Sequence, residues 1–298
     1  MGGIKLIKGK NKAYESLRLH QRSTNHSELL VAHRGYSSLE PDNSYEGVER
    51  SLESECADII EIDVRMTKDN QLILHHDSTI DYRGRYTSID TINLDTLDES
   101  KVKSRNPSFN FENMLYDDFL FHLERFHNKD KEDQEIIKFE DFINWYPFDK
   151  KLIIDVKTDK VDPKFIEELN RILNEHKGDV YIQSADISFL TEMKKRYKDY
   201  SYLFIVNSID DIPHMDDDMD GFTIKSSFLS RAIIKDDKMY TIYTINSRNK
   251  YLSIISNPNY REDMYLVTDD PDYLCEVGEE HKKKELKWCH INVKYSNI

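Results

Sequence analysis

The fold of this chain is constrained most by an alternation between short apolar runs and segments that carry apolar residues at helical spacing. The runs have strand length, and they occur at 29–32, 59–64, 152–156, 180–183, 202–206, 221–224, 239–245 and 264–268. Strands that alternate with helices are typical of βα units with a parallel sheet. Eight such strands predict an α/β protein with the (β/α)8 TIM barrel fold, in which chemistry gathers at the carboxyl ends of the strands.

Capping residues predict where two of the helices begin. Asn43 lies three residues before Glu46, in the pattern of a capping box. Asp162 is followed by Pro163, and proline is favoured at the first helical position after an acidic N-cap. We therefore expect one helix to start after Asn43 and another after Asp162.

One further apolar run, 72–74, does not fit the parallel order. Only the turn at 67–70 separates it from the preceding strand. Because that turn is too short for a crossover helix, the run must return antiparallel as a hairpin. The segment from about 82 to 138 is polar and charged without strong strand signals, which predicts an insertion. The expected organisation is a leader at 1–28, a barrel at 29–275 with this insertion, and a tail at 276–298.

Charge and apolar patterning exclude several classes of function. The 42 basic and 56 acidic side chains give a net charge of −14, which repels nucleic acids and anionic bilayers. No apolar run approaches the roughly 20 residues of a membrane-spanning helix, and the first residues lack the apolar core of a signal peptide. Cys56, Cys275 and Cys289 are odd in number and scattered, which favours reduced thiols. We expect a cytoplasmic protein without stable membrane association or nucleic-acid partners, although a secreted chain trimmed of its signal would look the same.

Three carboxylates are expected to meet inside the barrel. Glu61 and Asp63 are two residues apart in one strand, so both side chains point to the same face, and Asp155 lies in the next parallel strand along the chain. Buried unpaired charge costs several kcal/mol. These carboxylates therefore either hold a hard divalent metal or pair with basic side chains, for which the candidates are Arg34, Arg65 and Lys157.

Two histidines are candidates for acid and base. His33 follows the first strand, and His76 follows the hairpin, so both are expected at the barrel mouth. Imidazoles have pKa values near neutral, where such catalysts work best. His75 is ambiguous, because it adjoins His76 and would point to the opposite face of a regular strand. The other histidines have no sequence neighbours that suggest a catalytic or metal-binding role, and we expect them to be structural.

Five short motifs of acidic, basic and histidine residues follow one another between residues 32 and 77. They are Ala32-His33-Arg34-Gly35, Pro41-Asp42-Asn43-Ser44, Glu61-Ile62-Asp63-Val64, Thr67-Lys68-Asp69 and His76-Asp77. In this order and at these spacings they resemble the glycerophosphodiester phosphodiesterase family. Looser likenesses follow at 139–141, 154–157, 243–246 and 267–271, so the resemblance covers about residues 29–275.

The resemblance implies a barrel with a small insertion after the His-Asp motif, and it implies roles for the residues already singled out. His33 and His76 would be the acid/base pair, Glu61, Asp63 and Asp155 would bind Mg²⁺ or Ca²⁺, and Arg34 and Lys157 would hold the substrate phosphate. The implied activity is metal-dependent hydrolysis of a glycerophosphodiester, a small-molecule substrate, to a phosphomonoester and an alcohol. A metal and two cations suit a phosphodiester whose negative charge grows in the transition state.

Departures from the family pattern bear on the metal and the substrate. Asp155 stands in place of a glutamate and is one methylene shorter, so metal affinity or preference could differ. Tyr243 stands where a tryptophan is common, and we expect it in the substrate pocket. The negative net charge favours a small soluble diester over a membrane lipid. The alternatives are a lysophospholipase D or sphingolipid phosphodiesterase-like activity, with an apolar rim on the insertion, and a non-catalytic barrel that binds phosphoryl ligands.

Overall fold

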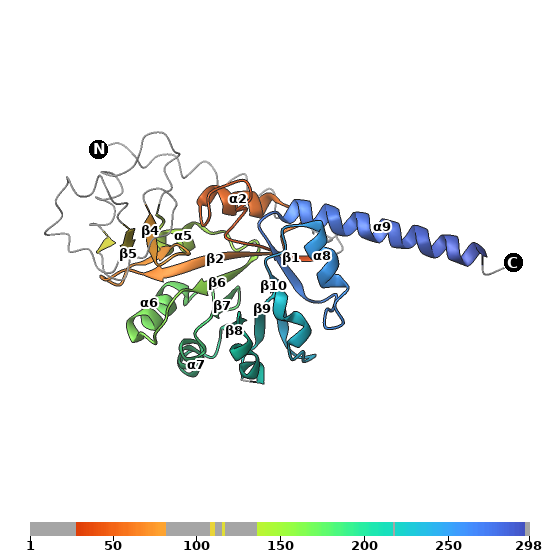
Figure 1. Ribbon diagram of the computed structural model, residues 1–298. Coiled ribbons are helices and arrows are strands. Elements are labelled where there is room, and N and C mark those ends of the chain that lie inside the picture. The colour runs from red at the N-terminus through yellow and green to blue at the C-terminus, as the bar shows by residue number, and fades with distance from the viewer. Residues whose placement is uncertain (1–27, 82–107, 111–114, 117–135, 217, 296–298) are drawn as a thin grey trace.

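The computed structural model describes residues 28–81, 108–110, 115–116, 136–216 and 218–295 (Figure 1). Eight parallel strands in this part of the chain form a closed barrel, since β1 pairs in parallel with both β2 and β11. The strands are β1 (Leu29–Ala32), β2 (Ile59–Met66), β6 (Lys151–Val156), β7 (Val180–Ser184), β8 (Ser201–Val206), β9 (Gly221–Lys225), β10 (Met239–Tyr243) and β11 (Tyr265–Thr268). The predicted (β/α)8 barrel is confirmed.

The predicted hairpin is also confirmed. Strand β3 (Leu72–Leu74) pairs antiparallel with β2, with Val64 opposite Leu74 and Met66 opposite Leu72. Beyond it, β4 (Thr79–Asp81) pairs antiparallel with β5 (Ser108–Asn110) in a separate two-stranded ribbon at the start of the expected insertion. Most of that insertion, at 82–107, 111–114 and 117–135, lies outside the described residues.

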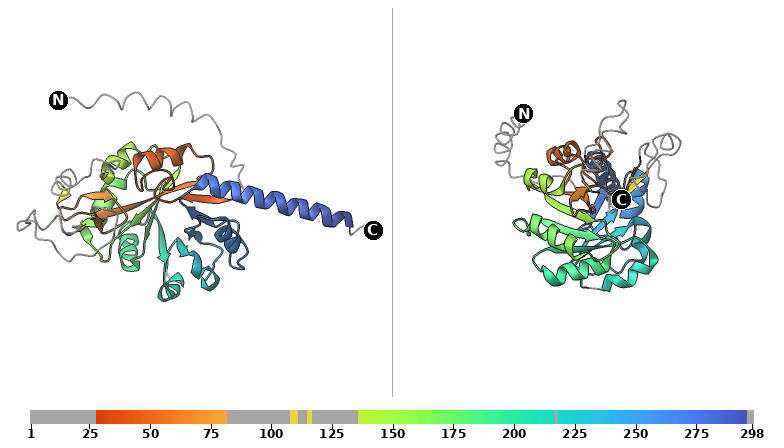
Figure 2. Two further views of the ribbon diagram at one scale, coloured as in Figure 1. Left: turned by 45° about the horizontal axis from the view of Figure 1, so that its top comes forward. Right: turned by 90° about the vertical axis from the view of Figure 1, so that its left-hand side faces the viewer.

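Helices follow most of the strands and pack around the sheet (Figure 2). They are α2 (Tyr45–Glu53), α5 (Phe139–Trp145), α6 (Pro163–Leu173), α7 (Ile187–Arg196), α8 (Arg248–Ile255) and α9 (Pro271–Tyr295). After β8 and β9 the connections are instead the 3₁₀ segments η3 (Ile209–Asp216) and η4 (Ser226–Arg231). Pro213 lies inside η3, where a proline disfavours a regular α-helix because it lacks an N–H.

The two predicted helix starts have different outcomes. Helix α6 begins as expected, since Asp162 accepts a hydrogen bond from the Lys164 N–H and Pro163 occupies the first position. For α2, the prediction of Asn43 is wrong by one residue. The N-cap is Ser44, whose hydroxyl accepts from the Gly47 N–H at 3.1 Å. The side chain of Asn43 instead makes contacts inside the barrel.

The strands bury both of their faces, and the two faces differ. Ile60, Ile62 and Val64 of β2 belong to the large core between the barrel and its helices. The alternating residues belong to the lumen, where Ile59 packs in a small apolar cluster with Val31, Ile153, Leu203 and Val267. Because side chains alternate along a strand, Glu61 and Asp63 project into the lumen on the same side as Ile59. The carboxylates of Glu61 and Asp63 therefore lie next to an apolar cluster inside the lumen.

Helix α9 runs straight out from the barrel, as two views show (Figures 1 and 2). It spans residues 271–295, so the expected boundary between barrel and tail at residue 275 falls inside one helix.

Cys275 of α9 forms a disulfide bond with Cys56, which lies just before β2, and the two Cα atoms are 6.0 Å apart. The expectation of reduced thiols is therefore wrong for this pair. Among the described residues, no helix has the length and apolar character needed to cross a membrane.

Candidate active site

Three carboxylates meet in the lumen near the carboxyl ends of β2 and β6. Glu61 and Asp63 come from β2, and Asp63 is the register partner of Asp155 on β6. Each of the three residues is at most 4% exposed. They offer oxygen atoms that all lie within 4.8 Å of one another. The structure thus brings together the three carboxylates that the strand spacing singles out.

Lys157 directly follows β6 and contacts two of these carboxylates. Its Nζ is 2.6 Å from Asp155 Oδ2 and 3.1 Å from Asp63 Oδ1. Burial alone would lower the pKa of Lys157, but the neighbouring charges of Asp155, Asp63 and Glu61 raise it above its usual range. Lys157 therefore stays charged.

Arg34 supplies the second cation from the turn after β1. Its Nε is 3.3 Å from Asp63 Oδ2, its Nη1 donates to Asp42 at 2.7 Å, and its backbone N–H donates to Glu61 Oε2 at 2.9 Å. The turn needs a left-handed backbone, with φ of 54° at Arg34 and 80° at Gly35. A Cβ on residue 35 would lie 2.8 Å from the backbone of α2, so only glycine fits there.

Arg65, the third basic candidate, contacts backbone oxygens beside the carboxylates, since its Nη1 lies 3.5 Å from the carbonyl of Lys157. Its Nε donates to the backbone carbonyl of His76 at 2.8 Å. Its function in the structure is to hold the segment that carries His76. Arg34 and Lys157 each lie against Asp63, so both of these cations contact the carboxylate cluster.

The clustering of acids shows in the pKa values of the strand β2 carboxyls. Burial first, and then the charge of Asp63, raise the pKa of Glu61 to about 8. Burial would also raise the pKa of Asp63, but Lys157 and Arg34 outweigh it and lower that pKa to about 2. The pKa of Glu61 therefore lies above that of Asp63, and a cation placed beside Glu61 would lower it.

The donor set fits a hard divalent cation. Asp63 Oδ1 and Asp155 Oδ1 are buried and have no hydrogen-bond partner in the described part of the chain, although Lys157 lies beside the first of them. Mg²⁺ and Ca²⁺ take carboxylate oxygens as ligands. A cation among Glu61, Asp63 and Asp155 would bind the unpartnered oxygens and stabilise ionised Glu61. The three residues can therefore hold a divalent metal.

His33 is held by a carboxylate from the other end of the chain. Its Nδ1 lies 2.6 Å from Oδ1 of Asp269, which follows β11, and the Asn246 side chain donates to the second oxygen of Asp269. Burial alone would lower the pKa of His33, but the bond to Asp269 and the charge of Glu61 raise it overall. With Nδ1 engaged, Nε2 is the ring nitrogen that can exchange a proton with a ligand.

His76 is arranged in a similar way on the hairpin side. Its Nδ1 lies 2.9 Å from Asp77 Oδ1, and its backbone is held by Arg65. The neighbouring His75 bonds through Nδ1 to the Asp77 backbone carbonyl at 2.9 Å, and its backbone N–H donates to the Asp63 carbonyl. Burial lowers the pKa of His75. His75 therefore remains neutral and anchors the hairpin beside the carboxylates.

Two residues of this arrangement were not assigned to the site from the sequence. Asn43 has φ of 58°; its Nδ2 donates to Asp63 Oδ2 at 3.0 Å, and its Oδ1 accepts from the Asp63 N–H at 2.8 Å. Asp269 orients His33. The signal for Asp269 was its place directly after a predicted strand. For Asn43, the signal was its residue type, because asparagine adopts the left-handed backbone region more readily than most residues do.

Tyr243 lies at the end of β10 and is half-buried. Burial and the charge of Asp155 raise its pKa to about 12, so the phenol stays neutral and can donate a hydrogen bond. Its assignment to the substrate pocket stays a prediction.

Comparison with known proteins decides the family. The model of the glycerophosphoryl diester phosphodiesterase family matches residues 33–270, a range that runs from His33 through Asp269. The chain belongs to this family. The resemblance carried by the motifs is therefore confirmed.

Structures of family members share the fold at low sequence identity. A glycerophosphodiester phosphodiesterase from Parabacteroides distasonis is 15% identical with a TM-score of 0.63, covering 86% of this chain and 99% of that one. An Oleispira antarctica phosphodiesterase, in complex with the product sn-glycerol-3-phosphate, is 15% identical with a TM-score of 0.57, covering 84% and 96%.

Curated relatives match over shorter segments. An uncharacterized protein of Mycoplasma genitalium is 34% identical over 134 residues, which is 45% of this chain and 46% of that protein. The chain thus matches less than half the length of the curated relatives.

Proposed function

We propose that this protein hydrolyses a glycerophosphodiester to glycerol phosphate and an alcohol, with a divalent cation bound by Glu61, Asp63 and Asp155. The observation that carries the proposal is the cluster of three buried carboxylates in the lumen of a family member. Such a cluster needs a further positive charge, and it lies among the residues that could bind and cleave a phosphodiester.

Arg34 and Lys157 bind the phosphoryl group in this proposal. Both remain charged, and both already lie against Asp63 at one edge of the carboxylate cluster. A guanidinium can make two parallel hydrogen bonds to phosphate oxygens, and an ammonium adds a point charge. The cation, when bound, would offset the charge that develops on the phosphoryl oxygens. Asp42 keeps the guanidinium of Arg34 oriented through its 2.7 Å bond.

His33 and His76 move the protons. One imidazole takes a proton from the attacking water molecule as the new P–O bond forms. The other gives a proton to the alkoxide as the P–O bond to the alcohol breaks, so the products are a phosphomonoester and an alcohol. In each ring a carboxylate holds Nδ1, from Asp269 and Asp77 respectively. Both rings therefore present Nε2 to the substrate.

The test is an assay of the purified protein on a panel of glycerophosphodiesters, with EDTA and after addition of Mg²⁺ or Ca²⁺. Chelation should silence hydrolysis, and one of the two cations should restore it. Full activity after exhaustive chelation would contradict the metal role and favour charge compensation of the carboxylates by Arg34 and Lys157.

A lysophospholipid remains a second candidate substrate because of one observation. Leu39, Val161 and Ile209 are 56%, 40% and 55% exposed, and they lie in the connections that follow β1, β6 and β8. Exposed apolar side chains at the mouth of a barrel can contact an acyl chain. The net charge still favours a small soluble diester. A kcat/KM for lysophosphatidylcholine more than about tenfold above that for glycerophosphocholine would reverse this choice.

A further inference from the structure

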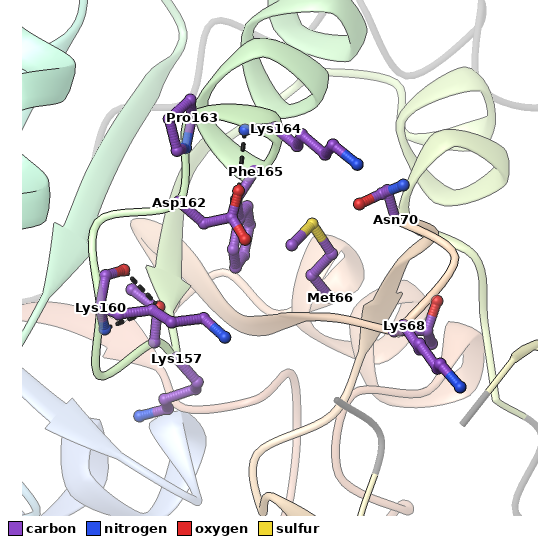
Figure 3. A pocket seen from close by; sticks show the side chains of 11 residues that line it. Met66, Lys68, Asn70, Lys157, Lys160, Asp162, Pro163, Lys164 and Phe165 are labelled. Atoms are coloured by element: carbon purple, nitrogen blue, oxygen red, sulfur yellow. Dashed lines mark hydrogen bonds between the residues drawn. The ribbon is translucent and has the colours of Figure 1, made fainter. Parts of the chain in front are cut away.

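Lys157 lies between the barrel lumen and a groove beside α6 (Figure 3). The groove has a volume of about 470 Å³ and is lined by residues of the β2–β3 hairpin and of the segment that follows β6. Lys157 turns its ammonium away from the other lining residues (Figure 3). In the lumen this ammonium contacts Asp63 and Asp155. A ligand held by Lys157 is therefore expected to extend across the lumen and not into the groove.

Tyr243 lies on the opposite wall of the lumen. Strand β10 is opposite β6, because β7, β8 and β9 separate them on one side and β11, β1 and β2 on the other. Tyr243 packs against the apolar cluster inside the lumen. Burial raises the pKa of its phenol, the charge of Asp155 raises that pKa further, and the charge of Lys157 lowers it. The phenol therefore lies within electrostatic reach of the site residues on β6.

Lys225 lies beside Tyr243 at the open end of the lumen. The two residues are register partners on adjacent strands, which run about 4.8 Å apart. Lys225 follows Thr223 by two residues, and the Thr223 hydroxyl donates to Gln183 inside the lumen. Because side chains alternate along a strand, Lys225 projects from the same face as Thr223, whereas Ile224 belongs to the outer core. Lys225 is also the last residue of β9, which places it at the mouth of the barrel.

The ammonium of Lys225 is available to a ligand. Lys225 is exposed, and it forms no ion pair with another described residue. Asp211 of η3 is an acidic group on the same side of the mouth, since its charge also raises the pKa of Tyr243. The Oδ2 atom of Asp211 accepts the backbone N–H groups of Asn207 and Ser208 at 2.9 and 2.8 Å. Asp211 is thus held by its own segment.

The residues along this path suggest which alcohol they accept. With the phosphoryl group on Arg34 and Lys157, one alcohol arm of a diester can cross the lumen along Tyr243 toward Lys225. The phenol and the ammonium both donate hydrogen bonds, and the hydroxyl oxygens of a polyol accept them. The quaternary ammonium of choline offers no acceptor and has the same charge as Lys225, so it would be repelled.

We propose that Lys225 is a specificity-determining residue that contacts the alcohol arm of the substrate. It makes the enzyme prefer diesters of uncharged polyols to diesters of alcohols that carry a quaternary ammonium group. The inference rests on the proposed function.

Two diesters that share the glycerophosphoryl group test this preference: glycerophosphoglycerol and glycerophosphocholine. At low salt, kcat/KM should be at least about fivefold higher for glycerophosphoglycerol. Lys225→Gln should reduce this ratio to about twofold or less, and Lys225→Glu should bring it below one, because a carboxylate attracts choline. High salt should reduce the wild-type ratio, since it screens exposed charges.

A control variant separates the local charge from the overall charge. Lys198→Gln removes one positive charge from an exposed position in the turn between α7 and β8. This turn precedes β8, so it lies at the end of the barrel opposite the mouth. The control should keep the wild-type ratio. A ratio near one in the wild type, an equal drop in the control, or a wild-type ratio in Lys225→Glu would overturn the proposal.

Binding measurements separate this proposal from the proposed function. Titration calorimetry on His76→Ala, in which turnover is slow, should show the same preference for glycerophosphoglycerol, and adding Lys225→Gln should remove it. If the wild type hydrolyses neither diester but binding depends on Lys225 in this way, the proposed function fails and the assignment of Lys225 stands. If the wild type hydrolyses both diesters at a ratio that does not depend on Lys225, the proposed function stands and this assignment is wrong.

Discussion

Two sides of the barrel lumen bury polar side chains in opposite ways. On β7, β9 and β10, the residues Gln183, Thr223 and Thr241 are at most 5% exposed. They satisfy one another, because the Thr241 hydroxyl donates to Thr223 Oγ1 at 2.7 Å and the Thr223 hydroxyl donates to Gln183. This side is neutral, and its three polar side chains are linked by hydrogen bonds.

On β2 and β6, the lumen carries charged side chains whose hydrogen bonding is not fully satisfied among the described residues. Glu61, Asp63 and Asp155 are as deeply buried as the neutral group, yet two of their oxygens lack hydrogen-bond partners among the described residues. Buried polar groups are almost always paired, so unpaired ones call for an explanation. The difference teaches that burial of polar groups does not itself mark a functional site; an unbalanced set of charges does.

The largest expected effect is the loss of catalysis on the charged side. His33→Ala and His76→Ala should each lower kcat by about 10² to 10⁴, because each removes one proton transfer. The double variant should be little worse, since the two residues act as a unit. Circular dichroism should show an intact fold. If either single variant kept more than about a tenth of the wild-type kcat at neutral pH, the assigned pair would be wrong.

A smaller effect is expected for the residue that orients His33. Asp269→Asn should keep the His33 imidazole in place but stabilise its protonated form less well. We expect kcat to fall by about 10- to 100-fold. Because Asp269 raises the pKa of His33, the limb of the pH–rate profile that depends on His33 should move to lower pH. An unchanged profile with reduced activity would point to a purely structural function of Asp269.

The neutral side should show the reverse pattern. Thr223→Val removes a donor to Gln183 and an acceptor for Thr241. It should lower the free energy of unfolding by about 1–3 kcal/mol, because buried polar groups lose their partners. Its kcat/KM should stay within about threefold of the wild type. A large loss of activity without a loss of stability would break the distinction between the two sides.

The subtlest prediction concerns pH and Glu61. Its pKa in the folded protein is raised from 4.5 to about 8, so the unfolded chain loses this proton at lower pH than the folded one. The metal-free protein should therefore lose stability as pH rises between these two values. Glu61→Gln should flatten this part of the curve of melting temperature against pH, and added Mg²⁺ or Ca²⁺ should do so in the wild type. A steep curve in Glu61→Gln would assign the dependence to another group.

Local patterns were enough to predict much of this arrangement. The alternation of strands and helices specified the barrel, and the two-residue spacing placed Glu61 and Asp63 on one face. The short turn at 67–70 required the hairpin that carries His76. Each of these inferences depends on geometry within one or two elements.

Contacts between distant segments were not accessible in the same way. The His33–Asp269 bond joins residues 236 positions apart, and the bond between Cys56 and Cys275 spans 219. Both depend on the closure of β1 against β11, which no local pattern encodes. Asn43 was misassigned for a different reason: its left-handed backbone turns the side chain into the lumen, whereas a capping residue has an extended backbone.

The bond between Cys56 and Cys275 has a topological consequence for the barrel. It joins the chain just before β2 to the chain just after β11, so seven of the eight parallel strands lie within one covalent ring. Strand β1 lies outside that ring in the chain. It completes the barrel between β2 and β11, to which it is held by hydrogen bonds. Partial opening of the oxidised barrel should therefore begin at β1, and amide hydrogen exchange should be fastest there among the parallel strands. Since His33 follows β1, the first segment to detach would carry one of the two histidines away from the other.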